Sequence, residues 1–120
     1  MSIAPCWQEL EAPAPRHPNE LDLRRIERAI TDRVRYRYVE PCVLPDTDGY
    51  LVRSPCCSRN IAPDGAEIDV ALLEWTEFTP GWNLFRKDHQ AQAWVLDSRF
   101  ARLPDLFGRL NSDPDRVFWQ

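Results

Sequence analysis

The chain lacks several features that would point directly to a known chemistry. It has one lysine, Lys87, and four glycines among its 120 residues, and no apolar run approaches the length of a membrane span. It also contains no Gly-rich phosphate loop, no Gly-x-Ser-x-Gly turn and no His-Glu-x-x-His helix motif. The common signatures of nucleotide binding, serine hydrolysis and zinc proteolysis are therefore excluded.

Charge and the first residues limit the cellular setting. The formal net charge is -4, so long-range attraction of the whole molecule to nucleic acid or anionic lipid is not expected. Residues 1–6 lack the basic and apolar regions of a secretion signal. We therefore expect a cytoplasmic protein whose four cysteines are reduced thiols and form no disulfide framework.

The N-terminal stretch differs in composition from the rest. Four prolines fall within residues 1–18, and proline removes backbone donors and disfavours a helix at the preceding residue. The sequence predicts a flexible Pro-rich tail over 1–18 and a single domain over 19–120. Trp7 and Leu10 are bulky apolar side chains in this tail, available to a partner or to the domain itself.

Periodicity predicts the secondary structure of the domain. Asn19 is a good N-cap, and apolar residues then recur at spacings of three and four to about residue 32. Alternating residues over 34–39, 50–53, 67–75, 82–86 and 92–96 predict strands, with turn residues over 45–49. In the third of these strands, Ile68, Val70 and Leu72 are expected on one face. Pro104 suits the start of a final helix that stops near 111–114.

Short turns between these strands favour antiparallel neighbours. The predicted fold class is α+β, with an N-terminal helix, a four- or five-stranded antiparallel meander and a C-terminal helix. If the helices cover one face of the sheet, the other face is partly solvated.

The C-terminal third carries a recognisable pattern. Its parts are a Trp82-x-Leu84-x-Arg86-x-Asp88 strand, Trp94, an apolar helix over 103–110, Asp113-Pro114 and a closing Phe118-Trp119. This pattern resembles a bacterial family catalogued only as a domain of unknown function, from which Gln120 departs, since glycine is expected there. The resemblance implies a small compact domain and assigns no activity.

The cysteines form one candidate site. Cys42 follows the first predicted strand of a hairpin and Cys56 and Cys57 follow its partner, so the three sulfurs could converge on a zinc ion. His89 is the best fourth ligand and His17 a poorer one. The alternatives are that Cys42 and one of the adjacent pair are small buried apolar residues, or that the Cys56-Cys57 loop carries a redox or nucleophilic thiol.

The loop after these cysteines is a second candidate. Ser58, Arg59 and Asn60 offer a hydroxyl, a guanidinium and an amide that together could hold a carboxylate or phosphate. An ordinary polar turn that satisfies its own backbone is the competing interpretation.

A third candidate is nucleic-acid binding by the Arg/Tyr segment. Arg35 and Arg37 alternate with Tyr36 and Tyr38, as in surfaces that stack bases and pair phosphates. The same alternation places the two kinds of side chain on opposite strand faces, which favours an ordinary solvated strand.

The leading hypothesis is a non-enzymatic interaction domain that needs no cofactor, with zinc expected only under the cysteine hypothesis. It depends on the absence of paired catalytic groups and on apolar residues at both ends of the chain. Trp7, Leu10, Phe118 and Trp119 are predicted to form the partner surface.

Overall fold

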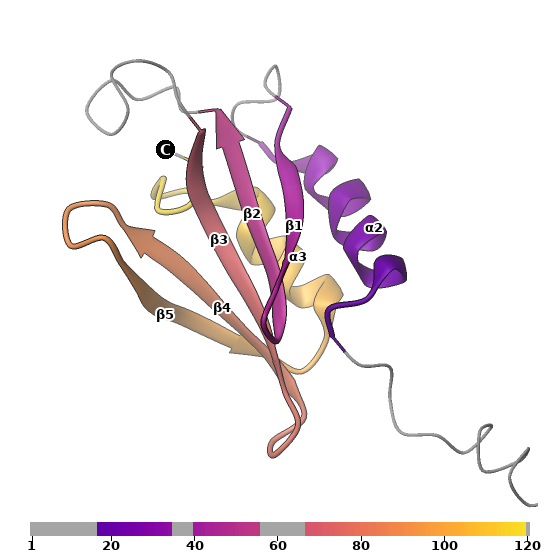
Figure 1. The fold of residues 1–120 in the computed structure, drawn as a ribbon. Coiled ribbons are helices and arrows are strands. Elements are labelled where there is room, and N and C mark those ends of the chain that lie inside the picture. The colour runs from indigo at the N-terminus through magenta and orange to yellow at the C-terminus, as the bar shows by residue number, and fades with distance from the viewer. Residues whose placement is uncertain (1–16, 35–39, 56–66, 120) are drawn as a thin grey trace, which may run out of the picture.

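The computed structural model describes residues 17–34, 40–55 and 67–119 (Figure 1). Its elements, in chain order, are α2 (Glu20–Ala29), η1 (Ile30–Asp32), β1 (Cys42–Asp46), β2 (Gly49–Pro55), β3 (Glu67–Thr76), β4 (Gly81–Asp88), β5 (Ala93–Phe100) and α3 (Leu103–Ser112). The predicted α+β class is confirmed, with one helix before the strands and one after them.

The five strands form one antiparallel sheet in the order β1-β2-β3-β4-β5, which confirms the predicted meander. Ile26 of α2 and Leu106 and Leu110 of α3 join Leu73 and Leu84 of the sheet in one buried core. Both helices therefore cover the same face of the sheet (Figure 1). None of the helices in the described ranges is long and apolar enough to cross a membrane.

The first hairpin lies further along the chain than its pattern predicted. Its first strand is Cys42–Asp46 rather than residues 34–39, and residues 35–39 lie outside the described residues. Pro45, predicted in the turn, instead pairs with Tyr50 inside the ladder. Proline is tolerated there because β1 is an edge strand, where a missing donor leaves no ladder bond unmade.

A register shift between β2 and β3 changes which residues face the core. Val52 pairs with Ala71 and Arg53 with Asp69, so Val70 is an extra residue without a partner on β2. Such a β-bulge reverses the alternation of the strand beyond it. Val70 and Ala71 are both buried, and the expectation that Leu72 shares their face is wrong.

The C-terminal residues fold back onto the domain around one carboxylate. Asp113 is buried, and its two oxygens accept the backbone N–H groups of Val117, Phe118 and Trp119 at 2.8, 3.1 and 2.8 Å. The Trp119 indole N–H donates to the carbonyl of Leu110 at 2.9 Å. This arrangement gives a physical role to the terminal Asp-Pro and Phe-Trp pairs of the sequence.

Phe118 and Trp119 are core residues, which corrects their assignment to the partner surface. Phe118 is 0% exposed and Trp119 is 1% exposed. The guanidinium groups of Arg109 and Arg33 lie 5.2 and 5.1 Å from the two ring centroids, respectively. The aromatic end of the chain is turned inwards because the Asp113 carboxylate binds the backbone that carries it.

We expect Asp113→Ala to lower the free energy of unfolding by at least about 3 kcal/mol, since hydrogen bonds to a charged group contribute about 1.5–3 kcal/mol each. The variant leaves three amide donors without their acceptor. Urea unfolding measures the change. Asp115→Ala, at an exposed position nearby, is the control and should change stability by under about 0.5 kcal/mol; equal losses in the two variants would contradict the role of Asp113.

Candidate functional site

One row of apolar side chains crosses all five strands on the face opposite the helices. The register places each member directly opposite the next on the neighbouring strand. Leu44 and Leu96, at its two ends, are 41% and 55% exposed, and the three middle residues are half-buried. We call this set the open-face row: Leu44, Leu51, Leu72, Phe85 and Leu96.

The strand residues on one side of the open-face row form an ion-paired network. Asp69 binds Arg53 at 3.2 Å and Lys87 at 3.4 Å. The Lys87 ammonium also lies 4.9 Å from the centroid of the Trp94 ring, its cross-strand partner. Glu67, two residues before Asp69 on the same strand, lines the same pocket as Arg53, Asp69 and Lys87. This flank therefore has two cations and two anions.

The residues on the other side have the opposite balance. Arg99 donates to the side-chain oxygen of Asn83 at 2.9 Å, and the Asn83 amide lies 3.5 Å from Glu74. Asp46 stands at the β1 end of the same register row, which continues through Glu74 and Asn83 to Arg99. This flank has two anions and one cation, so the open-face row lies between a charge-balanced flank and a flank of net negative charge.

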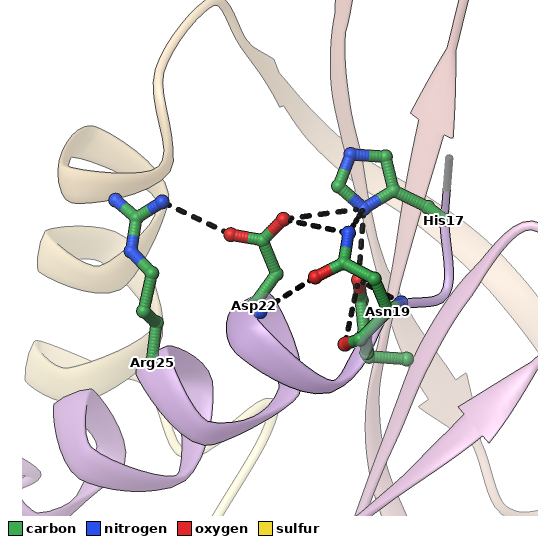
Figure 2. Close-up of polar contacts among 5 residues, drawn as sticks. His17, Asn19, Asp22 and Arg25 are labelled. Atoms are coloured by element: carbon green, nitrogen blue, oxygen red, sulfur yellow. Dashed lines mark hydrogen bonds and ion pairs between the residues drawn. The ribbon is translucent and has the colours of Figure 1, made fainter. Parts of the chain in front are cut away.

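A second polar cluster lies on the helix side, where residues 17–19 enter α2 (Figure 2). The Asn19 side-chain oxygen accepts the N–H of Asp22 at 2.8 Å, which confirms Asn19 as the N-cap. The Asn19 amide donates to the Asp22 carboxylate at 2.9 Å, and Arg25 binds the other carboxylate oxygen at 3.0 Å. Figure 2 shows the His17 ring pointing at this group.

His17 is held by Tyr50 as well as by this cap. The Tyr50 hydroxyl accepts the backbone N–H of Asn19 at 2.9 Å and lies 2.8 Å from His17 Nδ1. A neutral imidazole with an unprotonated Nδ1 satisfies this geometry, because it accepts the phenolic proton. The His17 side chain is 8% exposed and contacts the rings of Trp82 and Trp75 at centroid distances of 4.7 and 5.5 Å.

The His17 cluster serves as an anchor between the N-terminal segment and the sheet. Burial lowers the pKa of His17, and the Asp22 carboxylate opposes this shift more weakly. Burial also raises the pKa of Tyr50, so its hydroxyl stays protonated. Tyr50 is fully buried, and its hydroxyl is engaged with His17 and Asn19, so it presents no nucleophile or base to a substrate.

The cluster predicts a pH dependence of stability. The pKa of His17 in the folded protein lies below its ordinary 6.5, so between these two values the unfolded chain binds more protons. The contribution of His17 is complete above pH 6.5 and falls as the pH drops towards the folded pKa. Wild type should therefore lose more unfolding free energy than His17→Gln between pH 7.5 and 5, measured by urea unfolding.

His89 is present in both wild type and His17→Gln, so its own titration cancels when their losses of unfolding free energy are compared. Burial, and then Lys87, lower the pKa of His89. Equal losses of stability in wild type and His17→Gln would contradict the buried neutral imidazole at residue 17.

Two of the four predicted metal ligands, Cys42 and His89, lie within the described residues. Cys42 lies on β1, where its thiol donates to the Glu67 carboxylate at 3.6 Å, and burial followed by Glu67 raises its pKa. His89 lies in the turn after β4 and lines a pocket that Arg53 and Glu67 also line.

No group of three His, Cys, Asp or Glu residues in the described ranges could hold a metal ion. Several predicted site residues lie outside those ranges, so the hypotheses that depend on them remain predictions. These are Trp7, Leu10, Arg35, Tyr36, Arg37, Tyr38, Cys56, Cys57, Ser58, Arg59 and Asn60.

Sequence reasoning missed the open-face row and the His17 cluster. The row depends on the register of four strand pairs, and no local pattern links Leu44 to Leu96. His17 was placed in the tail because prolines precede and follow it. A histidine two residues before a strong N-cap was the available signal that the ordered segment starts earlier.

The comparisons with known proteins agree with the resemblance drawn above and extend it. The family model of a domain of unknown function, DUF3024, matches residues 14–120, well beyond the C-terminal third. The chain belongs to this family. Neither the search of curated proteins nor the search of solved structures found a significant match.

Proposed function

We propose that this domain is a non-enzymatic interaction module that binds an amphipathic α-helix of another protein on the open-face row. The observation that carries the proposal is the continuous cross-strand register of five apolar residues on the side of the sheet opposite the two described helices. Contiguous apolar surface with a polar rim is typical of protein-binding sites.

The width of the row favours a helix over a second sheet. The row is one residue wide, and ion-paired or charged residues flank it on both sides. A second sheet packed face to face would bury both charged flanks, which is costly for ions taken out of water. A helix with a narrow apolar stripe contacts the row and leaves both flanks at its wet edges.

The dimensions agree with one short helix. Four strand spacings of about 4.8 Å give the row a length of roughly 19 Å. At 1.5 Å per residue, a helix of about 13 residues spans that length. The net negative charge of the second flank predicts basic residues on the helix edge over Asp46 and Glu74.

The absence of an accessible reactive group in the His17 cluster supports a binding role over catalysis. His17 and Tyr50 bond to each other, and both contact buried aromatic rings. The His17 cluster therefore stabilises the fold.

A display library of 16-residue peptides with a fixed leucine stripe and random flanks tests the proposal. We expect selected peptides to carry basic residues on the flank over Asp46 and Glu74. Leu96→Lys should weaken their binding at least tenfold in fluorescence anisotropy, because it puts a charge into the row at an exposed position that folding tolerates.

Leu21→Lys is the matched control, since Leu21 is 71% exposed on α2 and lies outside the row. It should leave peptide binding unchanged. Equal effects of the two substitutions would contradict the open-face row as the site. Sedimentation analysis of the wild type tests one other occupant. If the wild type is a dimer and Leu96→Lys dissociates it, the row binds a second copy of the chain instead.

A further inference from the structure

A cavity of about 250 Å³ lies beside the strands β4 and β5, under the C-terminal segment. Its lining residues are Arg86, Lys87, Asp88, Val95, Arg116 and Val117. Arg86 pairs with Ala71 and Val95, and Ala71 is a core residue, so Arg86 belongs to the helix side of the sheet. The cavity is therefore independent of the open-face row.

Two of the four charged lining groups are already engaged elsewhere. Lys87 binds Asp69 on the open face. One Asp88 carboxylate oxygen accepts the backbone N–H groups of Gln90 and Ala91 at 3.0 and 3.1 Å and so stabilises the β4–β5 turn. The remaining charges are the guanidinium groups of Arg86 and Arg116.

Arg86 has a buried donor that lacks an acceptor. Its Nε is shielded from solvent and has no hydrogen-bond partner among the described residues. Asp97 interacts electrostatically with Arg86, but Arg109 bonds to both of its carboxylate oxygens, at 3.0 and 2.9 Å. Buried polar groups are normally paired, so this donor is available to an acceptor that binds from outside.

The C-terminal turn places Arg116 on the wall of the same cavity as Arg86. Arg116 has a left-handed backbone with φ 57°, and its N–H donates to the Asp113 carbonyl at 3.2 Å. Asp113 in turn binds the three amides that follow Arg116. The side chain of Arg116 makes no hydrogen bond or ion pair within the described part of the chain.

We propose that this cavity binds the phosphate group of a small-molecule phosphate monoester. Two guanidinium groups suit a phosphate oxyanion, and its charge of about -1.5 to -2 balances both of them, whereas a carboxylate balances one. Val95 and Val117 provide an apolar wall for the organic part of the ligand, and inorganic phosphate alone leaves that wall uncovered.

Titration of the full chain with phenyl phosphate, followed by ¹⁵N NMR, tests the proposal. We expect saturable shifts at the Arg86 Nε–H and the Arg116 amide, and at least tenfold weaker binding of inorganic phosphate and of benzoate. Arg116→Gln should weaken phenyl phosphate binding at least tenfold, and its exposed position makes it compatible with folding. Arg24→Gln, the same charge change on α2, should bind like wild type.

Arg86→Lys provides a second variant, because it keeps the charge and removes the Nε donor; binding should weaken at least fivefold while the spectrum stays folded. Equal binding by Arg116→Gln and Arg24→Gln, or benzoate binding as tightly as phenyl phosphate, would overturn the proposal. A phosphoserine peptide that binds tenfold tighter than phenyl phosphate would overturn the small-molecule assignment. Leu96→Lys should leave phosphate binding intact, which separates this test from that of the open-face row.

Discussion

The β-bulge at Val70 determines which side chains of the central strand reach each face of the sheet. Before it, Ile68 points to the core, and after it, Ala71 and Leu73 do so. An uninterrupted strand would continue the alternation and bury Leu72 in place of Leu73. β3 is the middle strand of the sheet and contributes residues to both faces. The helix-side core and the open-face row therefore both depend on this one extra residue.

A second register shift, between β4 and β5, has a similar effect at the other edge. Leu84 pairs with Ser98 and Phe85 with Leu96, so Asp97 lacks a partner on β4. Its carboxylate binds Arg109 of α3, and this pair lowers the pKa of Asp97. The bulge thus fixes α3 on the sheet and keeps Leu96 on the open face. The C-terminal turn beyond α3 then lies beside the end of β4, where the cavity lined by Arg86 and Arg116 is found.

The sequence predicted elements whose signals are local. The Asn19 cap and the start of α3 near Pro104 depend on neighbouring residues, and the structure confirms both. Leu72 was misassigned because the alternation argument assumes an unbroken strand register. A bulge depends on how two strands pair, so the sequence of one strand does not reveal it. Phe118 and Trp119 were misassigned because composition does not show that Asp113 binds the backbone N–H groups of these two residues. Predicting the open-face row requires the register of all four strand pairs, which no single segment of the sequence contains.

The most direct measurement is solvent paramagnetic relaxation of the leucine methyl groups in the full chain, with a neutral soluble gadolinium chelate. If the open-face row is an available binding surface, the methyls of Leu44 and Leu96 relax strongly, those of Leu51 and Leu72 relax to an intermediate degree, and those of Leu73 stay protected. Protection of Leu44 and Leu96 equal to that of Leu73 would show that another part of the chain covers the row, and would contradict its role as the partner surface.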